Sequence, residues 1–579
     1  MEKLIQEYCE KYQVDGLSLS IMKEGKVVFD FHYHSSNQIR YTIGSVSKTF
    51  IAIGILQLVE EGKCSLDDSV SLYIPGFYKE VTIGMLLNHS SGLDCVNFKG
   101  KYTNHPYPQY VDLMIERYKH VPLKSRAGKY SVYTNDGFVI AQRLIELLSG
   151  LSFHDYLIEK ICKPLGMMET TCPNEKMEEG TYKRVTTVFG KQYPQEYVNG
   201  IGSGGIYSTA YDLNLLMHSL AAHTLLSKES VDLMTSSHHV SHIHVDTNAG
   251  NYGLGLDHVE MPYFKAMGLK AYTKGGATYG YLSNVINIPE LDLNLAVVSA
   301  SNKGNIGLLA REVLGQYLNL PMKKITLKPF TRTINLGIYG NGNSVYNLYM
   351  NDGLVIEEYK EGKFIPKWKL ALEGNRFKGE EAFGFKDVEL AMYEQNGYSY
   401  LILDYKMQVH QRSIFAQKLE EQDIFIDLKP GYYVRNNEYI DQRNMNTQGQ
   451  LCIYIDSNLY MPYPLKAITQ TTAIPYVELP GSYAREMTTL EVNDPTHFTL
   501  GFYQYERLED NKLTSYMIKD DKIHWFKYNN EKVEVGDQVR IIGLDSKGNY
   551  IYDSYLSSDS FKGDYIGILG VENEEVKVS

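Results

Sequence analysis

The sequence has few cysteines for its length, and no two of them form a C-x-x-C pair. A disulfide framework or a thiolate metal site needs cysteines at short, paired spacings, so this pattern is typical of reduced thiols. We therefore interpret each cysteine as a free, buried thiol of a cytoplasmic protein. They are Cys9, Cys64, Cys95, Cys162, Cys172 and Cys452.

Long apolar runs are also missing. The longest lies near residues 50–59 and is far shorter than the ~20 residues that a helix needs to cross a bilayer. The first residues, MEKLIQEYCEKYQ, have the pattern of an amphipathic helix, and they lack the apolar core of an export signal. We expect a protein that neither enters a membrane nor leaves the cytoplasm.

An excess of basic residues is the third absence. The 57 Lys and Arg residues are outnumbered by 69 Asp and Glu residues, the formal net charge is −12, and no basic run stands out. A protein that binds nucleic acid or an anionic membrane surface usually carries a basic patch. Both partners are therefore excluded, and a small molecule, a short peptide or a second copy of the chain remains.

At 579 residues the chain is too long for one hydrophobic core, and its texture changes near residue 325. Before that point, strand-like and helical segments alternate, which indicates an α/β or α+β domain with an antiparallel sheet flanked by helices. After it, short strands are separated by polar turns such as YGNGNS and DSKGN, which is typical of antiparallel barrels or sandwiches. We predict domains at 1–325, 326–420 and 421–579. The helices are expected at 2–12, 46–61, 109–118, 137–149, 153–162, 211–221 and 305–317, and the strands at 17–22, 26–31, 282–287 and 293–299.

The stretch YTIGSVSKTF, residues 41–50, contains Ser45 and Lys48 three positions apart at the start of an apolar helical pattern. Residues i and i+3 are neighbours on a helix, so Lys48 can reach the Ser45 hydroxyl. The same S-x-x-K spacing at Ser20 and Lys23 lies in an alternating strand pattern, where the two side chains point to opposite faces. Ser45 is either an activated nucleophile or the N-cap of a buried helix.

Two further segments could complete a nucleophilic site. Tyr133 and Asn135 follow a glycine turn and precede an amphipathic helix, which would place them at the lip of a cleft. Lys274 precedes Gly275 and Gly276 in AYTKGGATYGY, where the glycines would let a strand backbone approach a ligand closely. Each of these motifs is short, and their order and setting carry the prediction.

Taken together, the S-x-x-K, Y-x-N and K-G-G motifs resemble the serine β-lactamase and penicillin-binding-protein superfamily. They are most similar to its class C-like branch, which includes D-aminopeptidases, D,D-peptidases and esterases. The likeness covers about residues 1–320 in order. Other segments that carry it are VDGLSLSIMKEGKVVFDF, VTIGMLLNHSSGL, FHDYLIEKICKPLGMMETT, GIGSGGIYSTAYDLNLLM, NYGLGL and LDLNLAVVSASN.

The resemblance implies a role for each motif residue. Ser45 would be acylated while Lys48 and Tyr133 act together on its proton, and the sequence leaves open which of the two is the base. Asn135 would hydrogen-bond the substrate amide, and the backbone N–H groups of Ser45 and Ala277 would form the oxyanion hole. Lys274, with Gly275 and Gly276, would bring positive charge near a substrate carboxylate or the Tyr133 oxygen.

The third motif departs from the lysine-threonine-glycine of many β-lactamases, because Gly275 replaces the hydroxyl residue. The favoured function is therefore a serine hydrolase of D-peptidase, D-aminopeptidase-like or esterase type. The alternatives are a β-lactamase or penicillin-binding protein with slow turnover, and a non-catalytic protein that binds peptides or cell-wall fragments. For the all-β region two roles remain open: it narrows the cleft and restricts substrates to short peptides or small esters, or it serves dimerisation or stability.

Neither a cofactor nor a metal is expected. The histidines of SSHHVSHIHVD, among them His242 and His244, have no companion acid or cysteine at ligand spacing, which favours a polar surface insertion. His89 lies in a turn with Ser90, Ser91 and Gly92, where a structural hydrogen-bonding role is expected.

Overall fold

The structure is a computed structural model in which most of the chain can be described. The described residues are 1–93, 101–103, 105–186, 192, 194–241, 251–320, 335–360, 362–373, 376–379, 388–406, 410–435, 452–461, 464–475, 477, 479, 488–500, 503–509, 511–519, 523–535, 539–546, 550–554, 563–570 and 575–579. The predicted boundary near 325, Cys95, His242 and His244 lie outside them. The five described cysteines are buried and unpaired.

The first 320 residues combine helices with an antiparallel sheet, as the sequence predicted. The strands are β1 (Leu17–Lys23), β2 (Lys26–Tyr33), β3 (Tyr41–Thr42), β4 (Tyr102–Thr103), β5 (Tyr197–Val198), β6 (Tyr207–Ser208), β7 (Tyr272–Ala277), β8 (Leu282–Ile288) and β9 (Leu293–Ser299). The helices are α1 (Glu2–Tyr12), α2 (Ser47–Glu60), α3 (Ile83–Leu87), α4 (Tyr110–Tyr118), α5 (Asp136–Ser149), α6 (Phe153–Tyr156), α7 (Lys163–Leu165), α8 (Ile201–Gly204), α9 (Ala210–Ala221), α10 (Lys228–Met234), α11 (Pro262–Lys265) and α12 (Ile306–Tyr317). Short helical turns are η1 (Gly44–Val46), η2 (Val70–Leu72), η3 (Leu157–Cys162, π-helical) and η4 (Pro289–Leu291).

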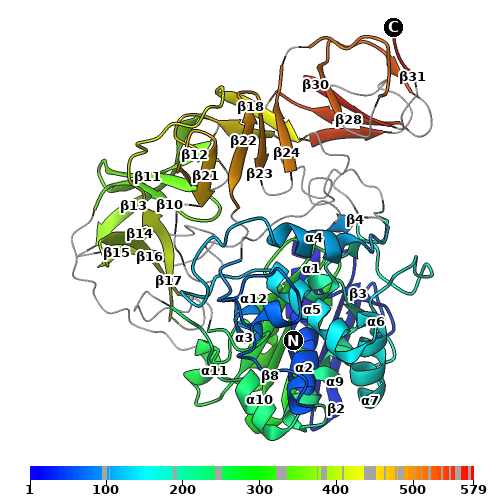
Figure 1. The fold of residues 1–579 in the computed structure, drawn as a ribbon. Coiled ribbons are helices and arrows are strands. Elements are labelled where there is room, and N and C mark those ends of the chain that lie inside the picture. The colour runs from blue at the N-terminus through cyan, green and yellow to red at the C-terminus, as the bar shows by residue number, and fades with distance from the viewer. Residues whose placement is uncertain are drawn as a thin grey trace.

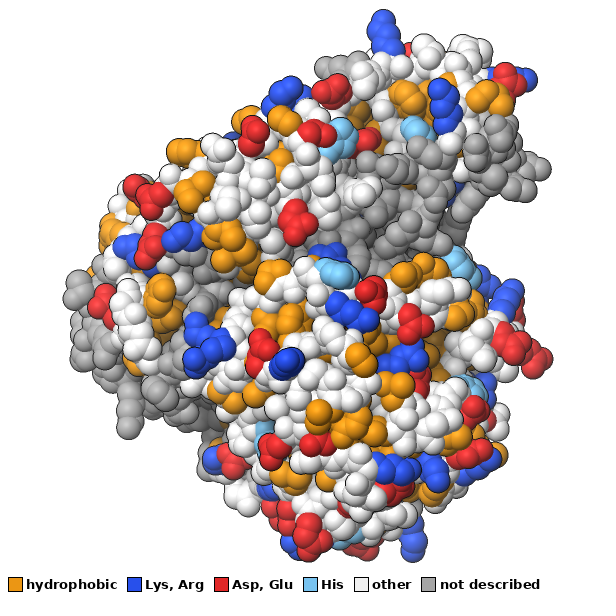
Figure 2. Space-filling model, viewed as in Figure 1, with side chains coloured by type: hydrophobic (Ala, Val, Ile, Leu, Met, Phe, Trp, Pro, Cys, Tyr) orange, Lys and Arg blue, Asp and Glu red, His pale blue; other side chains and the backbone are white. Residues whose placement is uncertain are grey.

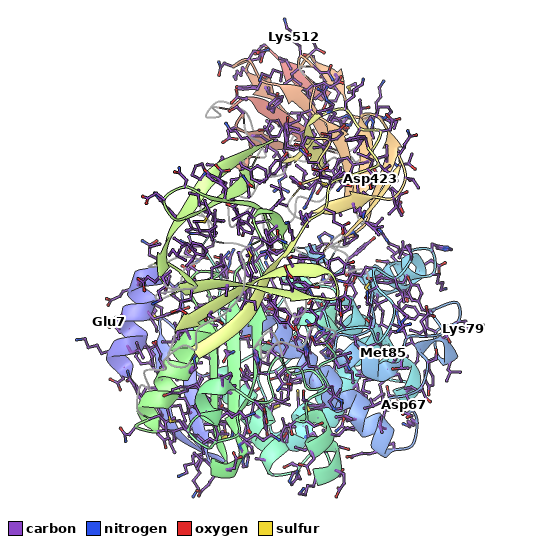
Figure 3. The ribbon with its side chains drawn as sticks, turned by 90° about the vertical axis from the view of Figure 1, so that its left-hand side faces the viewer. Glu7, Asp67, Lys79, Met85, Asp423 and Lys512 are labelled. Atoms are coloured by element: carbon purple, nitrogen blue, oxygen red, sulfur yellow. The ribbon has the colours of Figure 1, made fainter. Side chains whose placement is uncertain are left out.

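The main sheet has the order β2-β1-β9-β8-β7, and each neighbouring pair is antiparallel. Successive residues of a strand point to opposite faces. On β9, Leu295 and Val297 therefore pack in one core with α1 and α12, whereas Ala296 and Val298 pack in the other core with α2, α5 and α9. The sheet thus lies between two helical layers, which overlap in the lower part of Figure 1 and are seen on either side of the strands in Figure 3.

Helix α2 lies in the centre of the larger core. Almost all of its residues up to Leu58 are buried, which explains why its sequence is apolar around the whole helix. Its predicted start at residue 46 is slightly early, because the 3₁₀ turn η1 occupies Gly44–Val46. The helix predicted at 153–162 is α6 followed by the π-helical turn η3, and α10 was not predicted.

The rest of the described chain is all β, and the predicted fold class is confirmed. Strands β10 to β17 close into an antiparallel barrel, in which β10 pairs with both β11 and β17. Further strands form sheets of the orders β19-β18-β24-β23-β22-β21-β20, β25-β31-β27 and β26-β30-β28-β29. The strands are β10 (Gly337–Gly340), β11 (Val345–Met350), β12 (Leu354–Lys360), β13 (Lys363–Glu373), β14 (Arg376–Gly379), β15 (Val388–Gln395), β16 (Tyr398–Lys406), β17 (His410–Lys418), β18 (Gly431–Arg435), β19 (Cys452–Ile455), β20 (Leu465–Ala467), β21 (Thr472–Pro475), β22 (Leu490–Asp494), β23 (His497–Leu500), β24 (Tyr503–Arg507), β25 (Tyr516–Met517), β26 (His524–Lys527), β27 (Val533–Glu534), β28 (Arg540–Leu544), β29 (Tyr550–Ser554), β30 (Tyr565–Leu569) and β31 (Glu575–Val578).

The all-β region packs onto the segment that precedes Tyr133. Tyr130 and Val132 are buried in the same hydrophobic cluster as residues of the barrel and the seven-stranded sheet, such as Val345 and Leu465. In the side view of Figure 3, Glu7 on α1 and Met85 on α3 mark opposite sides of the helical part, and Asp423 and Lys512 lie in the all-β region. The all-β region is therefore in contact with a segment that leads directly to a predicted site residue.

The surface agrees with the charge balance of the sequence. On the face shown in Figure 2, Lys and Arg side chains are interspersed with Asp and Glu side chains. Within the described residues, none of the helices has both the length and the apolar character that a membrane-crossing helix needs.

Candidate active site

Ser45 and Lys48 lie next to each other where η1 joins α2. The Lys48 Nζ atom is 3.0 Å from Ser45 Oγ, as the i, i+3 spacing predicted. Lys48 is fully buried and Ser45 is partly exposed. Ser45 lies inside the 3₁₀ turn, and the N-cap residue of α2 is Val46, so the alternative in which Ser45 caps this helix is wrong.

Two further oxygen atoms hold the Lys48 amine. Lys48 Nζ donates to Asn135 Oδ1 at 2.8 Å and to the Ser203 carbonyl oxygen at 2.6 Å. Asn135 precedes α5, and Ser203 lies in α8 within the GIGSGG segment. These two oxygens can only accept hydrogen bonds, so they bind two of the N–H groups of Lys48. The remaining tetrahedral position on its nitrogen, a third N–H or a lone pair, then points at Ser45 Oγ.

Tyr133 lies between the two predicted lysines. Lys48 Nζ and Lys274 Nζ are each 5.1 Å from the centroid of its ring, and Lys274 Nζ donates to the Tyr133 hydroxyl at 3.3 Å. Tyr133 is buried, and its ring stacks on His89 with centroids 4.4 Å apart. The structure therefore brings Ser45, Lys48, Tyr133, Asn135 and Lys274 together, although they come from three distant parts of the sequence.

The backbone of η1 touches the backbone of β7. A Cβ atom added to Gly44 would lie 2.7 Å from the Ala277 nitrogen, and one added to Gly276 would lie 3.0 Å from the Ser45 nitrogen. Only glycine permits so close an approach, and Gly44 also has a positive φ of 50°. This contact brings together the two chain segments whose N–H groups were predicted to form an oxyanion hole.

Asp257 is a charged neighbour of the site that the sequence analysis missed. Its Oδ1 accepts from Lys274 Nζ at 2.8 Å, and its Oδ2 accepts from the Gly275 N–H at 2.9 Å. Burial is the largest single influence on Lys274 and would lower its pKa, but the charges of Asp257 and Tyr133 and the hydrogen bonds to them together raise that pKa. Burial opposes the ionised form of Asp257 as well, yet the nearby Lys274 ammonium lowers the pKa of this carboxyl. Both groups are therefore charged at neutral pH.

His89 supports Tyr133 from behind. It is buried, and its Nδ1 accepts a hydrogen bond from the Thr134 N–H at 3.1 Å. Burial, with the positive charges of Lys48 and Lys274 as further causes, lowers the pKa of His89 well below its usual 6.5. The imidazole is therefore a neutral acceptor, which agrees with the structural role expected from the sequence.

The low pKa of His89 predicts a pH dependence of stability. In the unfolded chain this histidine binds a proton below its usual pKa, so the free energy of unfolding should fall as pH drops below 6.5, by at most about 1.4 kcal/mol per pH unit. The variant His89→Asn keeps an acceptor for Thr134 and tolerates the positive φ of 64°. Denaturation midpoints at pH 5, 6 and 7 should decrease less steeply for this variant than for the wild type, and equal slopes would contradict the prediction.

The comparison with protein families extends this description beyond single motifs. The beta-lactamase family model matches residues 1–314, which is more than half of the chain. The chain belongs to the beta-lactamase family. The resemblance inferred from the three motifs is thereby confirmed.

In sequence, the chain is similar to two proteins of Bacillus subtilis (strain 168), penicillin-binding protein 4* and PbpX. The first is 30% identical to this chain over 261 residues, which are 40% of this chain and 57% of that protein. A second, PbpX, is 26% identical over 311 residues and matches 50% of this chain and 75% of its own length. The chain thus spans little more than half of the first relative.

Solved structures agree with the beta-lactamase fold. An octameric penicillin-binding protein homologue from Pyrococcus abyssi has a TM-score of 0.51 and 23% identity, covering 72% of this chain and 99% of its own. A structure of SurE with D-Leu has a TM-score of 0.50 and 20% identity, covering 71% and 98%. At these identities the likeness shows the fold, and the reaction has to be argued from the site.

Proposed function

We propose that this protein is a serine hydrolase that cleaves an amide or ester through an acyl intermediate on Ser45. The observation that carries the proposal is the geometry around Lys48. With two N–H bonds fixed by Asn135 and Ser203, a neutral amine would present its lone pair to the Ser45 hydroxyl at 3.0 Å. This is the arrangement that a serine needs in order to become a nucleophile.

In the first step, Ser45 Oγ forms a bond to the substrate carbonyl carbon while its proton passes to Lys48 Nζ. The carbonyl oxygen becomes an oxyanion, for which the N–H groups of Ser45 and Ala277 are the proposed donors. These donors cost no reorganisation during the reaction, because the contact between Gly44 and Ala277 fixes their segments in advance.

In the second step, the leaving group departs with a proton. Tyr133 is the proposed donor, because its ring lies beside Lys48 Nζ, which is 5.1 Å from the ring centroid, and its hydroxyl is held by Lys274. Lys48 returns the proton to Tyr133, so the pair ends neutral and the acyl group remains on Ser45. Water then attacks the acyl carbon by the same route in reverse, which releases the acid and restores the Ser45 hydroxyl.

For the substrate we propose a D-amino-acyl amide or a small ester. The fold is shared with a structure of SurE that contains D-Leu, which makes D-amino-acyl compounds the first to test. Penicillin is the second, because the relatives in Bacillus subtilis are penicillin-binding proteins. A β-lactamase with fast turnover is less favoured, since Gly275 lacks the hydroxyl that helps to hold a β-lactam carboxylate.

The proposal is tested by intact-protein mass spectrometry after incubation with a labelled penicillin and, separately, with a fluorophosphonate. We expect one adduct from the fluorophosphonate on the wild type and none on Ser45→Ala. A penicillin adduct that persists would indicate a penicillin-binding protein with slow turnover, and one that disappears would indicate a β-lactamase.

Failure to form either adduct on folded protein would contradict the proposal. It would favour the alternative of a protein that binds peptides or cell-wall fragments without turnover. The Ser45→Ala variant is a clean control here, since it removes one oxygen atom and leaves Lys48 bonded to Asn135 and Ser203.

A further inference from the structure

The outer edge of β7 carries a charge that no motif predicts. Strand β7 is the last strand of the main sheet and pairs with β8 on one side. On its other side, the Thr273 N–H donates to the His258 carbonyl oxygen and the Gly275 N–H donates to Asp257 Oδ2. Because N–H groups two residues apart on a strand point to the same edge, the Ala277 N–H is the next along this edge.

Asp257 is therefore a neighbour of the proposed oxyanion position. Two residues of a strand span about 7 Å, so its carboxylate lies roughly that far from the Ala277 N–H. Suppose that a substrate binds along this edge with its carbonyl oxygen at the Ala277 N–H. The substituent about 7 Å further along the substrate then lies near Gly275. There it meets the carboxylate of Asp257 in place of a free backbone donor.

Lys274 has no hydrogen-bond donor left to offer a substrate carboxylate. An ammonium group has three N–H donors, and those of Lys274 already bond to the Tyr133 hydroxyl, Asp257 Oδ1 and the Gly275 carbonyl oxygen. The side chain of Lys274 is 1% exposed, whereas that of Asp257 is 25% exposed. Of the two partners, Asp257 is the one whose side chain is partly exposed.

We propose that Asp257 sets the substrate specificity of this site by rejecting substrates that carry a carboxylate about 7 Å from the reacting carbonyl. Neutral groups and amines at that position are accepted, because they can donate to the exposed carboxylate. This inference rests on the proposed function for its substrate, but it concerns binding along β7 and can be tested without turnover. Of the two roles expected for Lys274, positive charge near the Tyr133 oxygen agrees with its hydrogen bond to that hydroxyl, whereas attraction of a substrate carboxylate stays a prediction that this proposal opposes.

The test uses two esters of N-acetyl-D-alanine that differ in one group, the 3-carboxyphenyl ester and the 3-carbamoylphenyl ester. Both are measured with the wild type and with Asp257→Asn, and the result is the ratio of their kcat/KM values. The intrinsic reactivities of the esters cancel, because both proteins see the same pair. We expect the ratio of carboxyl to carbamoyl ester to rise about tenfold in Asp257→Asn, as loss of a nearby like charge requires.

Two further variants separate specificity from damage to the fold. The carbonyl oxygen of asparagine can replace only one of the two carboxylate oxygens that bind Lys274 and Gly275. Asp257→Asn is therefore expected to lower kcat/KM for both esters. The ratio of the two kcat/KM values changes only if the lost charge matters. Asp257→Glu keeps the charge and should keep the low ratio of the wild type. Glu229→Gln, on the exposed surface of α10, changes the net charge equally and should leave the ratio unchanged.

The same comparison on Ser45→Ala, where the esters are not consumed, gives dissociation constants by calorimetry. One outcome is that the wild type hydrolyses neither ester, but adding Asp257→Asn to Ser45→Ala shifts the ratio of the two dissociation constants. The specificity proposal then holds and the proposed function is wrong. If the wild type hydrolyses the carbamoyl ester but neither ratio changes in Asp257→Asn, the specificity proposal is wrong and the proposed function stands.

Discussion

Replacing Lys48 with methionine is expected to lower kcat/KM about a thousandfold, the range found for loss of a general base. Methionine has a similar unbranched chain and fills the same buried channel, so the packing around α2 should be kept. What the variant loses is the atom 3.0 Å from Ser45 Oγ that can take its proton. The measurement is kcat/KM for a neutral ester, together with the rate of labelling by a fluorophosphonate.

The chain supplies a matched control in its second S-x-x-K sequence. Lys23→Met makes the same substitution at the exposed end of β1, three residues after Ser20 on the strand, and should leave kcat/KM unchanged. Lys48→Met also leaves Asn135 Oδ1 and the Ser203 carbonyl oxygen without their donor, which costs about 1–3 kcal/mol for each buried group. A folded Lys48→Met protein that keeps a tenth or more of the wild-type activity would show that Lys48 is not the base.

The part of the site that could be predicted from the sequence is the part that local geometry determines. Ser45 and Lys48 are three residues apart on a helical pattern, so their contact follows from the helix itself. Lys48 and Asn135 are separated by 87 residues, and only the order of the three motifs suggested that they meet. That order was informative because it resembled a family whose match to residues 1–314 is now established.

Two contributions to the site have no signature in the sequence. Ser203 bonds to Lys48 through its backbone carbonyl oxygen, and any residue type could supply that atom. Asp257 is a single acid 17 residues before Lys274. Its position depends on the backbone hydrogen bonds that Thr273, at the edge of β7, makes with Asp257 and His258. Such tertiary contacts are independent of the motif that they support, so pattern analysis could not find them.

The all-β region shows the same limit at the level of the fold. Frequent polar turns predicted its short antiparallel strands, because adjacent strands joined by turns pair locally. Closure of the barrel depends on Tyr339 in β10 pairing with Lys418 in β17, which are 79 residues apart (418 − 339). The contact of Tyr130 and Val132 with this region is likewise a long-range product of folding.

The variant Gly276→Ala is expected to reduce kcat about 10²–10³-fold, the loss that follows removal of one oxyanion donor. The added Cβ would lie 2.0 Å from the Ile43 carbonyl oxygen, 2.4 Å from the Ser283 hydroxyl oxygen and 3.0 Å from the Ser45 nitrogen. The Ser283 side chain can rotate, but the other two are backbone atoms, so their overlap is relieved by moving β7 away from η1. That movement separates the N–H groups of Ser45 and Ala277, whereas Lys48 and Tyr133 keep their positions relative to each other.

Two other glycines make this prediction specific. Gly307→Ala on α12 places its Cβ 3.6 Å from the nearest atoms, which is an ordinary contact, and should leave kcat unchanged. Gly275→Ala, one residue before Gly276 on β7, also meets nothing closer than 3.6 Å and should lose far less activity than Gly276→Ala. Equal losses of kcat in Gly275→Ala and Gly276→Ala would mean that the contact between β7 and η1 is not the cause of the loss. In that case Ala277 would not be the second oxyanion donor, because the overlap with Ile43 and Ser45 exists at Gly276 and not at Gly275.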